Sequence, residues 1–450
     1  MSKQNQTQLY SADEHIPLRK AEREESGEQS TRMTLISMMK CSIGTGVLAI
    51  PHSYATGGIA LMTVTLLFLA AWNVFSSLRL IGCEHLLTIE ELRNYRQSTE
   101  SPLAALARVA IGRYGAGLVE FVFFGLVFGV VTSYLKACHD TAAPLVMTWT
   151  GTPAQNDVFI YSALSLPLSL VRDVGRLAPV QTLGLGAICI CLIMVMYYTY
   201  SDSTQNKRII PWLGPLTFSS HPARDVLMAW AQGFGVLSFC FGIVPIIPQF
   251  QRSMRHRNHF GIAVYGSCFL TFALYAILGI CIVYLDPTPP GNVLYELPPA
   301  TAALAARAVM GLVCIVSIPL PVVAGVEIIL KRFATSLQTR NLFLLGLAAR
   351  LLLYFGGAFV AAKVPSFSQI VSIVGAAAVS FLSFVLPPLL HGLLQYYTRK
   401  SLYPNELRWR LLANSFLSVD FFATILGAVV VTFVTYLVTV QVMEDLRQQK

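Results

Sequence analysis

Charged residues are scarce in this chain, and their scarcity excludes an ordinary soluble protein. Of the 450 residues, 12 % are Asp, Glu, Lys or Arg and 55 % are hydrophobic, whereas soluble domains carry about 25 % charged residues. The mean hydropathy is +0.61. The formal net charge of +9 comes from basic residues in short loops between apolar runs. Because these residues form no stripe on a soluble face, we expect no nucleic-acid partner. The expected partner is a lipid bilayer.

Groups of residues that would carry catalysis or hold a metal are also missing. The nine cysteines lie in or at the ends of apolar runs, without metal-ligand spacing, and no disulfide framework can be read from them. No soluble region holds a nucleophile with a base, or a phosphate-binding loop. We therefore expect no enzyme, no metal site and no cofactor, with the cysteines serving as small packing residues.

The two ends of the chain are polar. Residues 1–32 have almost nothing to bury, which predicts a disordered cytoplasmic tail, and they do not resemble a signal peptide. Residues 443–450 are expected to form a short C-terminal tail. The sequence does not decide between the plasma membrane and a lysosomal or vacuolar membrane. Protein partners and oligomeric state are equally open.

Eleven apolar runs follow the first tail and predict an all-α membrane domain over residues 33–442. A span needs roughly 20 residues, and only the fourth run is short enough to suit a re-entrant segment instead. With eleven spans and the N-terminus inside, lysine and arginine concentrate in the inner loops, which places the C-terminus outside or in a lumen. The predicted spans are 33–55, 59–82, 117–138, 157–171, 179–200, 226–250, 260–285, 303–330, 342–363, 367–392 and 415–441.

Two of these spans are interrupted at comparable places. The first contains Ser42-Ile43-Gly44-Thr45-Gly46 and then Pro51, and the sixth contains Phe239 to Gly242 followed by two prolines. Glycine and proline are commoner in membrane helices than in soluble ones. Two breaks five spans apart nevertheless indicate an inverted repeat with broken helices, as in secondary transporters. The repeats would cover about 33–200 and 226–392, with 415–441 as an extra helix.

The residue types at the breaks predict a site for a zwitterion. Amides of Gly44, Thr45 and Gly46 at the start of a half-helix favour a carboxylate. Carbonyls released around residues 40–42 and 239–241 can accept hydrogen bonds from an ammonium group. The ligand is therefore expected to be an α-amino acid. The predicted binding residues are Ser42, Ile43, Gly44, Thr45, Gly46, Tyr134, Phe239, Cys240, Phe241 and Gly242.

Five groups of residues together match one known family. They are Lys40 to Pro51, Ser165 to Leu170 with Leu177-Ala178-Pro179, Phe239 to Gly242, Ser317-Ile318-Pro319 with Glu327, and Val374-Gly375 to Leu386-Pro387. Through these segments the chain resembles the amino acid/auxin permease family, most closely its proton-coupled branch. The resemblance runs in register from residue 33 to about 440. It implies eleven helices in the LeuT-like fold, built as a five-plus-five inverted repeat, and it implies amino acid transport.

The coupling ion has two candidates. The resemblance implies a sodium site between the first and eighth helices, where Ser317 matches the family's hydroxyl position. Lys40, however, lies two residues before the matching part of helix one, where its ammonium group could replace a cation or titrate. We favour protons over sodium. The simpler alternative is that Lys40 extends to the inner membrane interface.

Other charged residues within the spans have simpler expected roles. We expect Glu120, Lys136, Arg307 and Asp420 to lie at the membrane interfaces, because each is within a turn or two of a span end. Glu327 and Arg350 lie deeper, and a buried charge is tolerated chiefly when it is paired. These two residues could form an inner gate.

Two functions compete with transport. A channel would need polar rings along a pore, and no span is polar enough. A nutrient sensor with little flux is the more serious alternative, although the short tail offers little structure for a signalling partner. The expected function is transport of small neutral amino acids, and the sequence does not name which one.

Overall fold

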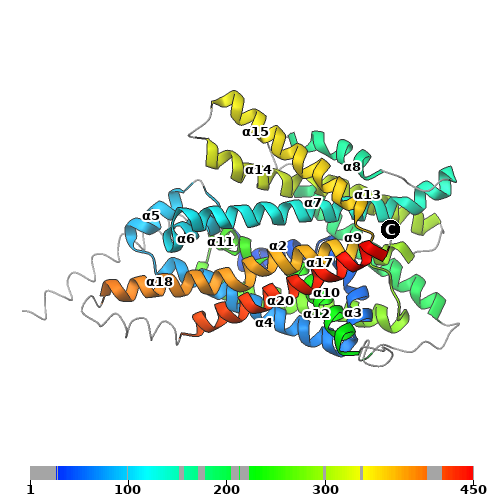
Figure 1. The fold of residues 1–450 in the computed structure, drawn as a ribbon, viewed down its shortest axis with the longest axis horizontal. Helices are drawn as coiled ribbons and strands as arrows, with labels where there is room; N and C mark the ends of the chain where they lie inside the picture. The colour runs from blue at the N-terminus through cyan, green and yellow to red at the C-terminus, as the bar shows by residue number, and fades with distance from the viewer. Residues whose placement is uncertain are drawn as a thin grey trace, which may run out of the picture.

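The computed structural model describes residues 27, 29–98, 100–151, 157–170, 178–203, 212, 222–296, 301–334, 338–402 and 418–448. Most of the predicted N-terminal tail lies outside these residues. In the described part all regular structure is helical, apart from one isolated bridge between Gln29 and Met254. The main helices form a bundle whose members run mostly along one long axis (Figure 1).

The helices follow the apolar runs of the sequence. Their bounds are α2 Thr31–Ser42, α3 Ile50–Gly57, α4 Ile59–His85, α5 Ile89–Gln97, α6 Pro102–Ile111, α7 Arg113–Thr150, α8 Asp157–Ser165, α9 Ala178–Ser203, α10 Pro222–Cys240, α11 Ile247–Ser253, α12 Phe260–Leu285, α13 Thr301–Ser317, α14 Pro319–Phe333, α15 Thr339–Leu351, α16 Gly357–Lys363, α17 Phe367–Val374, α18 Leu386–Leu402 and α20 Val419–Gln448. Short 3-10 turns are η1 Thr45–Ala49, η2 Leu166–Leu170, η5 Val244–Ile246, η6 Arg257–His259 and η7 Val293–Glu296. The π-helical turns are η8 Leu352–Gly356, η9 Gly375–Val379 and η10 Phe381–Val385.

Nine of the eleven predicted spans are long and apolar enough to cross a membrane among the described residues. Eight are continuous or gently bent, and the ninth is the bent pair Thr31–Ser42 and Thr45–Gly57. The fourth and fifth predicted spans correspond to the shorter apolar helices Asp157–Leu170 and Gly186–Tyr200. A count of eleven therefore remains a prediction.

Both predicted breaks are present. The first interrupts the helix after Ser42 and bends its axis by 53°. The sixth ends at Cys240 and resumes as η5 and α11. A further break separates α13 from α14 at Ile318, before the imide of Pro319, which has no N–H to donate to the preceding turn.

The sixth and tenth helices form the centre of the bundle. In the spans Ala223–Ser253 and Phe367–Ser401, 72 % of an 18-residue apolar stretch is buried inside the protein. The corresponding share is 33–44 % in the six other unbroken spans of the described chain. Their backbones touch at two glycines, because a Cβ on Gly375 would lie 1.8 Å from the Gly235 carbonyl oxygen. Small residues allow this close approach between helices, and it fixes the helix that carries the second break.

The segment between the second and third spans is helical and not the simple loop predicted from its sequence. It forms α5 and α6, at the left-hand end of the bundle in Figure 1. A reciprocal capping box between Thr88 and Glu91 starts α5, and the Ser101 hydroxyl caps α6. The apolar residues of α6 are buried against α7 and α18.

The two ends of the described chain lie at opposite ends of the bundle. Gln29 exchanges backbone hydrogen bonds with Ser253 and Arg255, beyond the last turn of α11. At the other end of that broken helix, Arg224 pairs with Glu444 of α20, and Figure 1 places the C-terminus there. The last helix continues to Gln448 rather than ending at residue 441. Helix α2 begins at Thr31, so residues 29–32 differ from the disordered tail that was predicted through residue 32.

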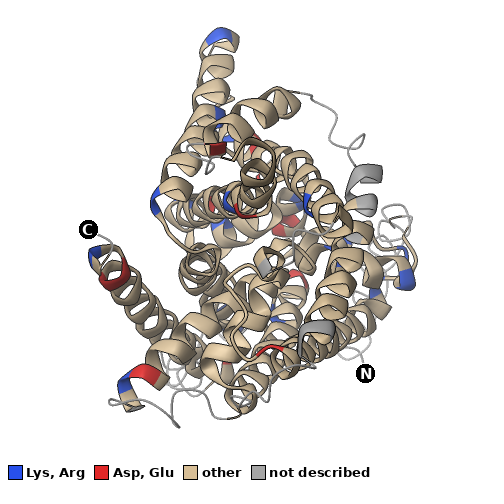
Figure 2. Ribbon diagram, turned by 90° about the vertical axis from the view of Figure 1, so that its right-hand side faces the viewer, with Lys and Arg blue, Asp and Glu red and all other residues tan. Residues whose placement is uncertain are grey.

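Charge is sparse on the ribbon when it is viewed along the bundle axis (Figure 2). Four residues expected at the interfaces are instead buried and paired within the protein. Their partners are Arg332 for Glu120, Asp140 for Lys136, the carbonyls of Leu294 and Tyr295 for Arg307, and both Arg79 and His391 for Asp420. Position near a span end did not predict this for Glu120 and Asp420, because their partners come from distant helices.

Candidate substrate-binding site

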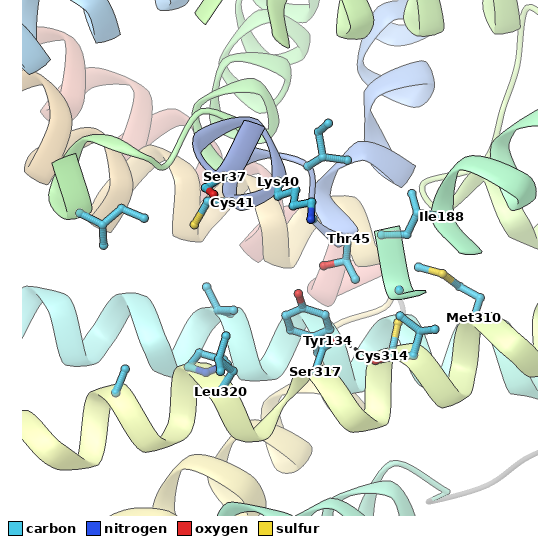
Figure 3. Close-up of a pocket in the computed structure, with 18 of the residues that line it drawn as sticks. Ser37, Lys40, Cys41, Thr45, Tyr134, Ile188, Met310, Cys314, Ser317 and Leu320 are labelled. Atoms are coloured by element: carbon cyan, nitrogen blue, oxygen red, sulfur yellow. Dashed lines mark hydrogen bonds between the residues drawn. The ribbon is translucent and has the colours of Figure 1, made fainter. Parts of the chain in front are cut away.

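A cavity of about 580 Å³ lies against the break in the first helix. A smaller one of about 140 Å³ adjoins it on the side of the sixth helix. Figure 3 shows the larger cavity between α2 and the pair formed by α7 and α13–α14. Of the predicted residues, Lys40, Ser42, Ile43, Gly44, Thr45, Gly46, Tyr134, Phe239, Cys240, Gly242 and Ser317 line one or both cavities.

The backbone at the first break leaves two amides available. The amide of Ile43 donates to Met39, and that of Gly44 donates back to the Ser42 carbonyl at 3.0 Å. The amides of Thr45 and Gly46 have no backbone acceptor among the described residues. The predicted set of three anion-binding amides is therefore reduced to two, because Gly44 closes a turn.

The two glycines at this break differ in their surroundings. A Cβ on Gly46 would lie 2.8 Å from the Phe239 ring and 2.9 Å from the Cys240 sulfur, so only glycine lets the first helix meet the sixth. A Cβ on Gly44 would meet only the Tyr134 hydroxyl, at 4.0 Å. Gly44 therefore leaves room in the cavity beside the free amides.

The sixth helix contributes one wall of the smaller cavity. Phe239, Cys240 and Gly242 line it. Phe241 lines neither cavity, because its ring is buried and packs edge-on against Tyr275. The interpretation of Phe241 as a residue that lines the site is thus wrong for this structure.

Tyr134 is the polar side chain at the junction of the two cavities. It comes from α7 and lines both, and Figure 3 shows its hydroxyl aimed at the break in the first helix. No hydrogen bond of that hydroxyl is found among the described residues. It is therefore placed to meet a ligand bound at the Thr45 and Gly46 amides.

The carbonyls expected to bind an ammonium group are partly engaged. Tyr275 of α12 donates its hydroxyl to Ser42 at 2.7 Å and lies 3.3 Å from the Cys240 carbonyl oxygen. The carbonyls of Phe239 and Phe241 accept from amides of the following turn. The Cys41 carbonyl accepts no backbone amide in the described structure. Sequence reasoning missed Tyr275, since nothing distinguishes it from other tyrosines in the same apolar helix.

The two ion-coupling candidates face the larger cavity. Lys40 lies in the last turn of α2 and its side chain is exposed to the cavity, and Figure 3 shows it extending towards the break near Thr45. Ser317 lies at the end of α13 and donates its hydroxyl to the Val313 carbonyl at 2.7 Å. That bond uses the hydroxyl proton and leaves its oxygen able to accept.

The expected ion pair between Glu327 and Arg350 is not formed. Glu327 lies on an exposed face beside Lys331, at 3.3 Å. Arg350 donates to the carbonyls of Ser169 and Gly346. The pair that does join the eighth helix to a neighbour is Arg332 with Glu120. The absence of a side chain at Gly117 makes room for this contact, because a Cβ on Gly117 would lie 3.0 Å from the Arg332 guanidinium.

The cavity extends from the break towards the end of the bundle where the described chain begins. It runs along α2 to Ser37 and along α11 to Phe250. On the other side of the break, residues 47–50 are fully buried. His52 is hydrogen-bonded to the Pro289 carbonyl, at 2.9 Å. The structure is thus closed on the side of α3.

Comparison with protein families decides the class. The family model for transmembrane amino acid transporter proteins matches residues 27–440. The chain belongs to this family. Two relatives are similar over most of their length. One is the amino acid transporter ANT1 of Arabidopsis thaliana, 24 % identical, with 94 % of this chain and 96 % of that protein covered. The other is the proton-coupled amino acid transporter-like protein pathetic of Drosophila melanogaster, 21 % identical, with 84 % and 79 % covered.

Solved structures establish the fold of this transmembrane amino acid transporter family member. A crystal structure of MhsT in complex with L-phenylalanine has a TM-score of 0.50 at 11 % identity, covering 93 % of this chain and 98 % of that one. Mhp1, a nucleobase-cation-symport-1 family transporter, has a TM-score of 0.53 at 12 % identity, covering 95 % and 94 %. The predicted LeuT-like fold is confirmed, and the family membership identifies a multi-pass transporter rather than an enzyme.

Proposed function

We propose that this protein is a secondary active transporter that moves small neutral amino acids by proton symport. The observation that carries the proposal concerns the amides of Thr45 and Gly46. Neither has a backbone acceptor among the described residues, and both residues line a largely apolar cavity. Such amides at the start of a half-helix bind a carboxylate. Tyr134 and the Cys41 carbonyl supply acceptors for the ammonium group.

The lining of the cavity favours a neutral side chain on the substrate. Among the described lining residues, Lys40 is the one that carries charge, and no acidic side chain is present to pair with a basic amino acid. The approach of Phe239 and Tyr134 to the free amides leaves about 140 Å³ in the smaller cavity, which suits a small side chain.

Proton coupling is favoured by the position of Lys40. An ammonium group facing the cavity supplies a built-in positive charge where a bound sodium ion would otherwise be needed. Sodium coupling through Ser317 and helix-one carbonyls is the alternative. The Drosophila relative, whose name describes proton coupling, supports the first choice.

The orientation follows from the same proposal. With the N-terminus in the cytoplasm, the C-terminus lies outside or in a lumen, since the two ends of the described chain are at opposite ends of the bundle. The cavity then opens inward. The membrane itself, plasma membrane or lysosome or vacuole, remains a choice for localisation experiments.

The test is uptake of a mixed pool of labelled amino acids into proteoliposomes, first under a pH gradient and then under a sodium gradient. Accumulation driven by external acid is the expected result. Drive by sodium alone would overturn proton coupling and move the ion site to Ser317. Binding without uptake under either gradient would favour a nutrient sensor.

A further inference from the structure

The hydroxyl group of Tyr275 lies where two helix ends meet. The first half-helix ends at Ser42 and the sixth at Cys240, and the carbonyls of both residues point to this one phenol, at 2.7 and 3.3 Å. The Tyr275 side chain is fully buried. It comes from α12, which lines neither cavity. Tyr275 therefore acts on the site only through the two breaks.

The electrostatics of this meeting point are unfavourable without a donor. The C-terminal end of a helix carries roughly half a negative charge, and two such ends converge here. The phenol has one proton to share between two carbonyl oxygens. The shorter contact, to Ser42, is the stronger bond, and the Cys240 carbonyl keeps spare accepting capacity.

Phe241 holds the phenol in place. Its ring packs edge-on against Tyr275, with centroids 5.7 Å apart. The same contact accounts for the burial of Phe241 outside the lining of both cavities. Phe241 of the sixth span and Tyr275 of the seventh thus connect the two breaks, and this connection is called the tie below. The tie determines how closely Gly46 packs against Cys240.

We propose that Tyr275 is a positioning residue that holds the two broken helices together. Its hydroxyl group lies between the C-terminal ends of their first halves, at a position that a monovalent cation could otherwise occupy. The assignment deepens the proposed transport function and rests on it for its role in substrate binding. The mechanical part, docking of the first break on the sixth, is independent of any substrate.

The first experiment measures that docking without substrate. Cys240 is buried against the position of Gly46, whereas Cys41 is exposed. Both can be followed in one purified sample by N-ethylmaleimide labelling and peptide mass spectrometry. In Tyr275→Phe we expect labelling of Cys240, relative to Cys41, to rise by about tenfold, as expected for loss of one buried hydrogen bond.

The matched control is Tyr284→Phe. Tyr284 lies on the same helix with 63 % of its surface exposed, so removal of its hydroxyl should leave the labelling ratio unchanged. Monodispersity and thermal stability of each variant show that it is folded. A conservative loss of one hydroxyl keeps the edge-on ring packing.

The second arm tests the place of the cation. In choline chloride Tyr275→Phe should show fast Cys240 labelling, and replacement of choline by sodium or potassium chloride should slow it towards the wild-type rate. The wild type should respond to neither salt. Unchanged Cys240 labelling in Tyr275→Phe would overturn the tie, and fast labelling in every salt would overturn the equivalence with a cation.

Amino acid affinity separates this inference from the proposed function. If the wild type binds an amino acid, its dissociation constant in Tyr275→Phe should rise by about tenfold in choline, and an unchanged affinity would overturn the role in substrate binding. Failure of the wild type to bind any amino acid would overturn the proposed function, while the labelling result would still decide the tie.

Discussion

The break in the first helix and the break in the sixth use their backbones differently. After Cys240, the amides of Phe241, Gly242 and Ile243 all donate to nearby carbonyls. After Ser42, the amides of Thr45 and Gly46 donate to no backbone carbonyl in the described part of the chain. The first break therefore leaves two backbone donors over, whereas the second bonds its own amides and contributes side chains to the cavity lining. Two interruptions with similar glycine and proline content thus differ in whether their backbone amides are hydrogen-bonded.

Replacement of Gly44 tests the ligand-binding break most severely. Gly44 has φ −116° and ψ −163°, which any residue adopts, so Gly44→Val should fold. Its side chain would occupy the space below Tyr134, and we expect uptake to fall by about a hundredfold or more, equivalent to about 3 kcal/mol of lost substrate binding. Uptake and membrane expression are measured together, and normal uptake would contradict a carboxylate site here.

Gly46→Ala tests the contact between the breaks. The added methyl group would lie 2.8 Å from the Phe239 ring, and overpacking of this kind costs about 1–3 kcal/mol. We expect uptake to fall by roughly tenfold or more. Gly125→Ala is the control, because a Cβ there meets nothing within 4 Å; equal effects of the two changes would argue against a specific contact.

Lys40→Gln tests the ion role of the first break. If Lys40 supplies the positive charge of the site, uptake should lose its response to an imposed pH gradient, a decrease of about tenfold in accumulation. Uptake with and without the gradient is the measurement. A retained response would show that Lys40 serves only as an interfacial lysine.

Tyr134→Phe should have a smaller effect. The Tyr134 hydroxyl has no hydrogen-bond partner among the described residues, so its loss removes at most one hydrogen bond to the ligand, about 0.5–1.5 kcal/mol. The concentration for half-maximal uptake should rise by a few-fold with little change in maximal rate. A fall in maximal rate alone would mean that Tyr134 acts in a conformational step.

Gly242→Ala should have the smallest effect and so completes the comparison. A Cβ on Gly242 would lie 3.1 Å from the Phe239 carbonyl oxygen, a tight contact inside a self-bonded turn. Uptake should change by about twofold, within the range of a backbone adjustment below 1 kcal/mol. An effect as large as that of Gly46→Ala would show that both breaks are equally exacting.

The sequence predicts the breaks well because glycine and proline act locally. Gly44, Gly46 and Pro51 weaken a helix wherever it packs, and both interruptions are present. The same reasoning could not show that the Gly44 amide would close a turn by donating to the Ser42 carbonyl. It also failed for Glu327 and Arg350, because an ion pair depends on the rotation of two helices, and spacing along the chain does not fix that rotation.

Helices α5 and α6 show a different limit. Thr88 and Ser101 are recognisable helix starts, but a search for membrane spans passes over helices this short. Tyr275 shows a third limit. Tyr265 and Tyr284 lie in the same helix and are exposed, and a helix that is apolar on all sides has no periodic signal to say which tyrosine is inside.

The two π-helical turns in the tenth helix, η9 and η10, change the angular position of every later residue around the helix axis. Each such turn takes up one extra residue, and one residue corresponds to about 100° of rotation in an α-helix. A helical wheel drawn with a single period from Phe367 onward would therefore place His391 on the wrong face. In the structure His391 meets Asp420 at 2.8 Å. A one-residue deletion within either turn could therefore be absorbed by conversion to ordinary α-helix, and every later side chain would keep its neighbours, whereas the same deletion in an α-helical part would rotate all later side chains by about 100°.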